Sequence, residues 1–458
     1  MSESLLSVGL DVGTTSTQMV FSRLQIENKA GSFAVPEMEI ESREILYKSP
    51  VHFTPLLQGD LVDADALRSI VDGEYAAAGI SKAQVDTGAI IITGETSRKE
   101  NARAVLDALS GYAGDFVVAT AGPDLESVLA AKGAGAVAYS EKYGKTVLHM
   151  DIGGGTSNLA LVENGKILAT TCLNVGGRLL KLDAEGKVTY VSPVLANLTE
   201  IKVGDTPILP QLEEVANMLC RALEMSAGRI DKTELLQQLS TDEVKEAWDV
   251  PRESLTVSFS GGVADCIEKE LPPLQFGDIG PLLGKAIRES SLCKKDYILG
   301  KETIRATVIG AGCHSTQLSG STVFCRNVEL PKKNLPVIMF SAREQESDHF
   351  AQFIADRLKR CDSPEAVLAM EGYESPDYSR VAALAEKIAA GTGDTPIYLC
   401  LQADMAKALG QRLSILLGDR PCLCLDRLKF TPESYLDIGA PVGPCFPVVI
   451  KTLVLSSG

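Results

Sequence analysis

The sequence predicts an α/β protein built from two similar halves and an additional C-terminal α/β module. The chain has 458 residues, which exceeds the size at which one hydrophobic core stops growing, so two or three domains are expected. A short apolar strand that runs into an Asp-hydrophobic-Gly turn occurs twice, at 5–13 and at 147–153. From about Pro331 a separate series of predicted strands and helices begins.

The composition excludes several classes of function. The formal net charge of −16 argues against a role on nucleic acid or on an anionic membrane, where positive charge supplies most of the affinity. No stretch approaches the ~20 apolar residues needed to span a bilayer, and the N-terminus lacks the features of a signal peptide. We therefore expect a cytoplasmic protein with no nucleic-acid and no membrane partner. Buried thiols are expected for the dispersed cysteines, with Cys422 and Cys424 on opposite faces of a strand.

The second glycine turn, within 147–158, carries the clearest signal for phosphate chemistry. After an apolar strand come Asp151, Ile152, Gly153, Gly154, Gly155, Thr156 and Ser157. Glycines let backbone amides converge on one point, which attracts anions, and the hydroxyls add donors. The Asp151 carboxylate would repel a bare phosphate, so it indicates a cation such as Mg²⁺ or a water to be activated. On this segment alone, a glycine-rich hairpin with a solvated aspartate remains the alternative.

The first turn repeats the same order of residues. It comprises Asp11, Val12, Gly13, Thr14 and Thr15. A second apolar run follows each turn at once, at 18–21 and at 159–162, so each copy is predicted to be a strand, a turn and a returning antiparallel strand. In the second copy Asn164-Gly165 then supplies a favoured hairpin turn. No G-x-x-x-x-G-K-[ST] motif occurs, which excludes a P-loop.

Between the turns, a run of small residues at 130–138 predicts a helix that allows close approach of a second helix, and this helix carries Glu126. Further on, the strand at 255–259 ends in Gly261-Gly262, followed by Asp265. Absent Cβ atoms there would let a flat ring or a ribose lie on the backbone, although such a pair is more often only a turn. Two other Asp-Ile-Gly steps, at Asp278 and Asp437, have prolines nearby and are predicted to be structural.

The segment 306–320 is the main rival nucleotide site. It has an expected apolar strand followed by Gly310-Ala311-Gly312. However, Gly320 interrupts the helix that a dinucleotide-binding unit requires, and the next predicted strand follows too soon for a crossover. We therefore do not favour a dinucleotide site here.

The C-terminal module shows no catalytic constellation, so we predict partner recognition for it by exclusion. Its expected strands are 336–340, 396–401, 421–425 and 448–455, its expected helices are 348–360, 378–390 and 403–417, and 362–377 is expected to be a loop.

The order of these motifs resembles the actin-like ATPase superfamily, which includes heat-shock chaperone ATPases, sugar kinases and bacterial cell-division filaments. The Asp11 turn, the small-residue helix, the Asp151 turn and Gly261-Gly262 resemble its first phosphate, connecting, second phosphate and adenosine segments. More closely, seven phrases across nearly the whole chain are similar to the ethanolamine ammonia-lyase reactivating factor. They are GLDVGTTSTQ, ITGETSRKENA, LESVLAAKGAGA, HMDIGGGTSN, SFSGGVADC, LDIGAPV and PVVIKTLV.

The resemblance implies an actin-like (ribonuclease H-like) α/β fold of two lobes around a nucleotide cleft. The expected ranges are 1–145 for the first lobe, 146–330 for the second and 331–458 for the C-terminal module. It also implies an ATP-dependent chaperone that uses ATP and Mg²⁺ to exchange damaged cobalamin on ethanolamine ammonia-lyase for intact adenosylcobalamin. Such a protein is expected in the cytoplasm, in association with the ethanolamine bacterial microcompartment.

The resemblance also implies roles for single residues. Phosphate binding is expected from Gly13, Thr14, Thr15, Gly153, Gly154, Gly155 and Thr156, and adenosine binding from Gly261, Gly262 and Asp265. Asp11 and Asp151 are expected to hold Mg²⁺ through its waters, and both take part in catalysis. Asp151 or Glu126 is expected to orient the attacking water, and Glu95 is a further candidate near the metal. Two alternatives stay open, a small-molecule kinase of the same superfamily and an ATP-binding cytoskeletal scaffold.

Overall fold

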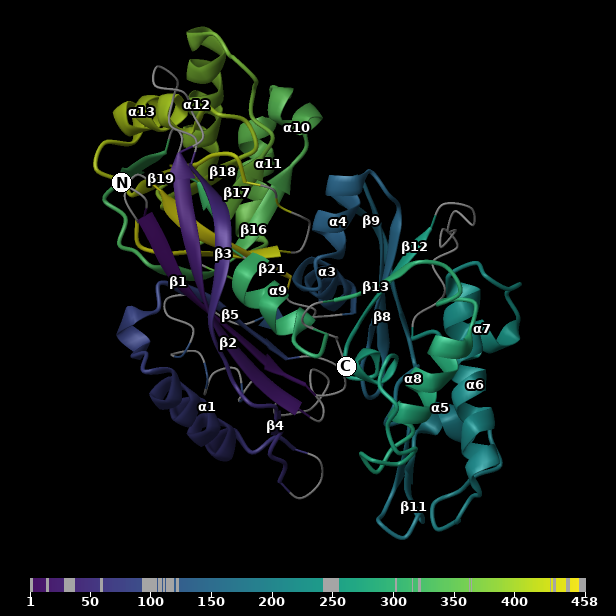
Figure 1. Cartoon of the computed structure of the whole chain (residues 1–458). Coiled ribbons are helices and arrows are strands. Elements are labelled where there is room, and N and C mark those ends of the chain that lie inside the picture. Colours follow the sequence, from purple (N-terminus) through teal and green to yellow (C-terminus); the bar gives the residue numbers. More distant parts are fainter. Residues whose placement is uncertain are drawn as a thin grey trace.

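The computed structural model describes most of the chain. The described residues are 3–13, 16–28, 38–57, 61–92, 105, 109, 112, 119–120, 123–241, 255–300, 303–314, 316–319, 323–361, 363, 365–428, 430, 434–441 and 445–452. Three candidate site residues, Thr14, Thr15 and Glu95, lie outside them. Two lobes lie side by side, and a third unit with its own helices adjoins the first lobe (Figure 1). No helix among the described residues is long and apolar enough to cross a membrane.

The first lobe is built on a sheet with the order β3-β2-β1-β5-β6, in which β4 also pairs with β2. Its strands are β1 (Glu3–Val12), β2 (Ser16–Asn28), β3 (Met38–Lys48), β4 (His52–Phe53), β5 (Thr87–Ile92) and β6 (Ala119–Thr120). The pairs β3-β2 and β2-β1 are antiparallel, and β1-β5 and β5-β6 are parallel. Helix α1 (Ala64–Ala78) covers one face, where its Leu67, Val71 and Tyr75 pack in the same core as strands β1, β2 and β5.

The second lobe repeats this arrangement in a sheet with the order β9-β8-β7-β12-β13. Its strands are β7 (Val147–Ile152), β8 (Ser157–Glu163), β9 (Lys166–Leu173), β12 (Thr256–Ser260) and β13 (Tyr297–Leu299). The first two pairs are again antiparallel and the last two parallel. Asn164 and Gly165 form the predicted hairpin turn, with φ angles of 49° and 75°. The same sheet order and strand directions in both lobes confirm the predicted two-lobed actin-like fold.

The remaining elements of the second lobe lie around this sheet. Helices α6 (Leu209–Ser226), α7 (Glu234–Leu239) and α8 (Gly280–Glu289) cover its outer face (Figure 1). Smaller elements are α4 (Ala136–Tyr143), the ribbon of β10 (Leu180–Leu182) and β11 (Val188–Val191), α5 (Pro193–Ala196) and the 3₁₀ turn η3 (Ala264–Cys266). The first lobe also has a 3₁₀ turn, η1 (Lys82–Gln84), which precedes β5.

Two helices, α3 (Pro123–Gly133) and α9 (Ala306–His314), cross between the lobes. Helix α3 follows the first sheet in sequence but packs on β7, β8 and β9, whereas α9 follows the second sheet and packs on β1, β2 and β5. They also pack on each other between the two sheets (Figure 1). The range 1–145 contains the first sheet and helix α3, which covers the second sheet. The range 146–330 contains the second sheet and helix α9, which covers the first sheet, so the boundary between the lobes stays a prediction.

The expectation of a strand at the start of 306–320 is wrong, since residues 306–314 form helix α9. Close backbone contacts of Gly310 and Gly312 account for the glycines in this helix. A Cβ at Gly310 would lie 2.1 Å from the carbonyl oxygen of Leu129 on α3, and one at Gly312 would lie 2.9 Å from the backbone nitrogen of Gly9 on β1. The glycine pattern that suggested a dinucleotide site therefore serves close contact between α9, α3 and β1.

The C-terminal module has a sheet with the order β14-β21-β20-β16-β17-β18-β19-β15. Its strands are β14 (Thr316–Ser319), β15 (Phe324–Arg326), β16 (Lys332–Phe340), β17 (Val367–Met370), β18 (Ile397–Leu401), β19 (Cys422–Leu425), β20 (Ser434–Ile438) and β21 (Phe446–Thr452). Its helices are α10 (Ala342–Glu346), α11 (Phe350–Lys359), α12 (Tyr378–Thr392) and α13 (Ala406–Leu417). Strands β14 and β15 precede residue 331, so the sheet begins before the predicted module does.

Two local expectations for this module are wrong. Strand β17 lies inside the expected loop 362–377, because four consecutive buried apolar residues pair with both β16 and β18 there. The sulfur atoms of Cys422 and Cys424 lie 3.8 Å apart on one face of β19, since residues two apart on a strand point the same way.

Candidate functional site

An equivalent backbone hydrogen bond spans each of the two predicted turns. In the first, the Gly13 amide donates a hydrogen bond to the carbonyl oxygen of Ser16, and in the second the Gly153 amide donates to that of Thr156, each at 2.9 Å. Asp11 and Asp151 occupy the same position, next to last in the strand that enters each turn. The predicted duplication of strand, turn and antiparallel strand is confirmed.

The segment 303–307, which leads into α9, connects the two turns. Gln18 pairs with Asp11 across β1 and β2, and its Nε2 donates to the carbonyl oxygen of Ile304 at 3.2 Å. From the same segment, the Thr307 hydroxyl donates to Asp151 Oδ2 at 3.4 Å. The strand ends that carry the two aspartates therefore meet on one short stretch of chain.

Asp151 is buried at the end of β7. The hydroxyl of Ser260, directly opposite on β12, donates to Asp151 Oδ1, and Thr307 donates to the other oxygen. Burial raises the pKa of the Asp151 carboxyl to about 6, and these two hydrogen bonds oppose the rise. A bound cation would favour the charged form further, because opposite charges lower a carboxyl pKa.

His149 lies behind this carboxylate and completes a buried polar chain. Its ring nitrogens lie 3.1 Å from the Ser258 hydroxyl and 2.9 Å from the Ser260 hydroxyl. Burial lowers the pKa of His149 to about 3, so the ring is neutral. Because Ser260 gives its single proton to Asp151, the His149 Nε2–H must donate to the Ser260 oxygen. The sequence reasoning missed Ser260 and Thr307 because only the fold brings them to Asp151.

These two buried groups have opposite effects on the pH dependence of stability. Between about pH 4 and about pH 6 the folded chain keeps a proton on Asp151 that the unfolded chain releases, which lowers stability as pH rises. In the same window the unfolded chain binds a proton at His149 that the folded chain does not bind, which raises stability as pH rises. The two contributions cancel in the wild-type protein.

We therefore expect Asp151→Asn to change the pH profile of stability. With only the His149 contribution left, the unfolding free energy of the variant should rise relative to wild type by up to about 1.4 kcal/mol per pH unit between about pH 5 and about pH 6. Urea unfolding of dilute protein, without nucleotide, measures this difference. Parallel profiles for the two proteins would show that Asp151 is not protonated in the fold.

Two buried amide side chains form a second pair that sequence reasoning missed. Gln18 and Asn158 stand opposite Asp11 and Asp151 on the returning strands. Gln18 Oε1 and Asn158 Oδ1 are both buried, and neither has a hydrogen-bond partner among the described residues. The sequence does contain a signal, because each amide stands at the same offset from its aspartate and directly before an apolar run.

The second turn rests on another glycine turn, at 174–178. The amides of Gly177 and Arg178 donate to the carbonyl oxygens of Gly153 and Gly154 at 3.1 and 2.7 Å. A Cβ at Gly176 would lie 2.3 Å from the Gly154 oxygen, so only glycine fits there. Gly155 is the exposed residue of the second turn, whereas Gly153, Gly154 and Thr156 are half-buried.

The predicted adenosine segment lies directly beside the second turn. Gly261 has a φ of +89°, and a Cβ on it would lie 2.3 Å from the carbonyl oxygen of Ile152, which explains its glycine without a ligand. Gly262 has open space around its Cα, the nearest atom to a Cβ being 3.9 Å away on Ile304. Asp265 accepts a hydrogen bond from the Thr303 hydroxyl. Its expected contact with ribose stays a prediction.

Glu126 lies on α3 and is half-buried. Because α3 packs on β7, the helix adjoins the strand that carries Asp151, but the role of Glu126 in orienting water stays a prediction. Among the described residues no group of three or more His, Cys, Asp or Glu side chains could hold a metal ion by itself. A magnesium site of one or two carboxylates completed by phosphate and water does not need such a group.

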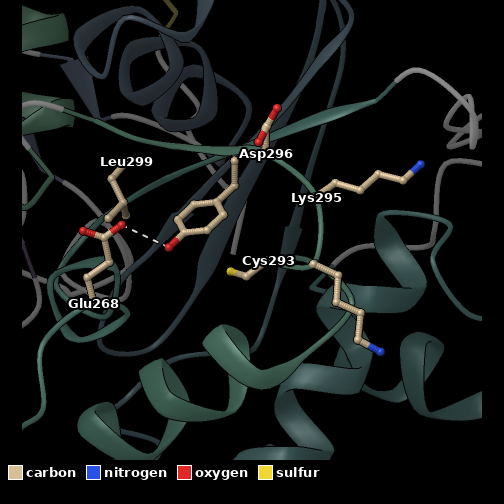
Figure 2. Close-up of a pocket in the computed structure, with 7 residues that line it drawn as sticks. Glu268, Cys293, Lys295, Asp296 and Leu299 are labelled. Carbon is tan, nitrogen blue, oxygen red and sulfur yellow. Dashed lines mark hydrogen bonds between the residues drawn. The ribbon is translucent and has the colours of Figure 1, made fainter.

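A separate depression of about 700 Å³ lies at the β13 edge of the second lobe (Figure 2). Its lining residues are Glu268, Cys293, Lys294, Lys295, Asp296, Tyr297 and Leu299. The Tyr297 hydroxyl donates to Glu268 Oε1 at 3.0 Å, and burial raises the pKa of the Cys293 thiol to about 11. None of the predicted site residues lines it.

Comparisons with solved structures give weak overall likenesses. A Ppx/GppA family member from Aquifex aeolicus is 14% identical with a TM-score of 0.40, covering 67% of this chain and 97% of that one. The ethanolamine utilization protein EutJ from Carboxydothermus hydrogenoformans is 19% identical with a TM-score of 0.34, covering 67% of this chain and 88% of that one. The fold assignment rests on the sheet order, not on these values.

Comparisons of sequence are far closer. A protein of Salmonella typhimurium (strain LT2) named "Ethanolamine ammonia-lyase reactivase EutA" is 40% identical over 479 residues, covering 99% of each chain. A protein of Escherichia coli (strain K12) with the same name is 39% identical over 466 residues, again covering 99% of each. The profile of the family described as "Ethanolamine utilisation protein EutA" matches residues 3–456. The chain therefore belongs to the ethanolamine utilisation protein EutA family.

Proposed function

We propose that this chain is an ATP-dependent reactivating chaperone of ethanolamine ammonia-lyase. In this proposal it promotes exchange of damaged cobalamin on the inactivated lyase for intact adenosylcobalamin, and it acts in the cytoplasm with the ethanolamine microcompartment. Two relatives that match 99% of the chain are named as reactivases of this lyase. The observation that carries the nucleotide part is the 303–307 segment, which hydrogen-bonds to Gln18 beside the first turn and to Asp151 beside the second.

Free polar groups at the turns fit a magnesium–nucleotide complex. Leaving a buried acceptor unpaired costs about 1–3 kcal/mol, so the unpaired oxygens of Gln18 and Asn158 are suited to the waters of a hydrated cation. Within the described part of the chain, the amides of Gly154 and Gly155 make no hydrogen bond and remain available to phosphate oxygens. Asp11 and Asp151 would add the carboxylates that Mg²⁺ prefers.

Each part of the chain then has a task in ATP hydrolysis. Bound Mg²⁺ would supply charge neutralisation on the phosphate oxygens. Residues Gly13, Thr14 and Thr15 of the first turn and 153–156 of the second would hold the phosphates between the lobes. Asp151 would orient the attacking water, with its own carboxylate fixed by Ser260 and Thr307.

Helices α3 and α9 could transmit a structural change from the nucleotide site to the partner-binding surface. The 303–307 segment includes the first two residues of helix α9, and α9 packs on α3, which packs on the sheet of the second lobe. A change in how the two turns close on the nucleotide would therefore shift α9 and α3 against each other. We propose that this shift alters the contact with the lyase, and that residues 1–145, 146–330 and 331–458 form the two lobes and the C-terminal module.

The proposal predicts recovery of enzyme activity in a defined mixture. Purified chain, ATP, Mg²⁺ and adenosylcobalamin are added to ethanolamine ammonia-lyase that its own turnover has inactivated, and deamination is measured. We expect deamination to return only when all four components are present, with ADP in place of ATP serving as the control. No recovery with the complete mixture, or equal recovery without the chain, would refute the proposal.

The same preparation tests the kinase alternative. Ethanolamine, sugars and carboxylates are offered as acceptors with labelled ATP. A chaperone should release phosphate to water only, whereas a phosphorylated acceptor would favour the kinase.

A further inference from the structure

Arg178 stands beside the second turn in a position that none of the expected roles explains. Its backbone amide donates to the Gly154 carbonyl oxygen at 2.7 Å, and its side chain extends across that residue. A Cβ built on Gly154 would lie 3.2 Å from Arg178 Cδ and 3.5 Å from its Cβ and Cγ. Glycine at position 154 therefore makes room for the arginine stem as well as for the turn.

Among the described residues, Asp278 is the one hydrogen-bond partner of the Arg178 guanidinium. Arg178 Nε donates to Asp278 Oδ2 at 3.2 Å, and Asp278 Oδ1 accepts from the Gly280 amide at 2.8 Å, which fixes the carboxylate. Asp278 is buried, with 7% of its side chain exposed, whereas the Arg178 side chain is 28% exposed. Because Asp278 uses only one oxygen for the arginine, the pair is not bidentate.

The contact with Asp278 does not involve the two terminal nitrogens of Arg178. Neither Nη1 nor Nη2 hydrogen-bonds to any described residue. A purely structural pair would gain from using both oxygens with the fork of the guanidinium. Instead, the side chain is anchored at Nε, and its terminal nitrogens lie beside a turn in which the amides of Gly154 and Gly155 make no hydrogen bond to a described residue.

We propose that Arg178 binds the terminal phosphate of the nucleotide and lets the protein distinguish a nucleoside triphosphate from a diphosphate. This inference rests on the proposed nucleotide site. Asp151 directs water at the terminal phosphoryl group, and the turn that Arg178 lies against begins two residues after Asp151. A planar guanidinium with two free nitrogens matches two phosphate oxygens, whereas an ammonium group would be a single point charge.

The test compares two nucleotides in matched variants. Arg178→Gln keeps most of the stem on Gly154 but removes the charge, and Arg178→Lys keeps the charge but removes the fork. Arg221→Gln, on the exposed side of α6, is the control. Equilibrium binding of a non-hydrolysable ATP analogue and of ADP is measured by calorimetry on the full chain with Mg²⁺.

We expect Arg178→Gln to weaken binding of the ATP analogue by roughly 10- to 100-fold. Its affinity for ADP should change by less than about twofold, because only the analogue has the terminal phosphate. The affinity of Arg178→Lys for the ATP analogue should lie between that of Arg178→Gln and that of wild type. Arg221→Gln should bind both nucleotides as wild type does. Equal weakening of both nucleotides, or no change in either, would overturn the assignment while leaving the nucleotide site intact. Wild-type protein that binds neither nucleotide would overturn the proposed function as well.

Discussion

Asp151→Asn is expected to lower ATP turnover by roughly 10²- to 10⁴-fold and to abolish recovery of the inactivated lyase. The amide has the shape of the carboxylate and its oxygen can still accept from Ser260. It lacks the charge that holds the cation and orients the attacking water, so the loss should fall on the chemical step. Phosphate release and ethanolamine deamination measure the two effects.

The matched control for this variant is Glu185→Gln, in the exposed turn between β10 and β11 of the same lobe. It removes the same charge at an exposed position outside both phosphate turns, so turnover and reactivation should equal those of wild type. If Asp151→Asn hydrolyses ATP and restores the lyase at the wild-type rate, Asp151 has no place in the mechanism.

Gly310→Ala is expected to destabilise the chain by at least about 3 kcal/mol, which lowers the thermal midpoint of a chain of this length by roughly 3 °C or more. The new Cβ would meet the Leu129 carbonyl oxygen at 2.1 Å, and a second close contact, Gly133 with Ala306, fixes the same crossing. Both partners are helix backbone, so neither can yield by a side-chain rotation. The packing of α3 on α9 should be lost, and thermal unfolding by circular dichroism measures the result.

Gly73→Ala provides the control of opposite sign. Gly73 lies in the interior of α1, is exposed, and has nothing within 4 Å of an added Cβ. Alanine should therefore stabilise the helix by about 0.5–1 kcal/mol. If the thermal midpoint of Gly310→Ala equals that of Gly73→Ala or exceeds that of wild type, the close crossing of α3 and α9 is contradicted.

The parts of the fold that the sequence predicts are those with a complete local signature. Each phosphate-type turn combines an apolar strand, an aspartate, glycines and a returning apolar strand in one short phrase, and both fold as expected. Helix α9 has no such signature, because a short apolar run before glycines fits a strand as well as a buried helix. Its state is decided by contacts with Leu129 on α3 and Gly9 on β1, which are distant in sequence.

In the candidate site, too, some residues can be predicted from local sequence and others cannot. Asp11, Asp151 and the glycines can be found from their spacing, but Thr307 reaches Asp151 across 156 positions of sequence, and Ser260 across 109. Such contacts exist only once the two lobes and α9 have packed. Arg178 also gave no signal, because an arginine after two glycines reads as an ordinary turn until Gly154 and Asp278 are placed beside it.

The most direct measurement is the position of Mg²⁺ and a non-hydrolysable ATP analogue in a crystal structure of the full chain. We expect the phosphates to lie between the turns at 13–16 and 153–156, with Asp11 and Asp151 reaching the ion through its waters. A nucleotide bound in the depression beside Cys293, or phosphates that touch only one of the two turns, would contradict the account.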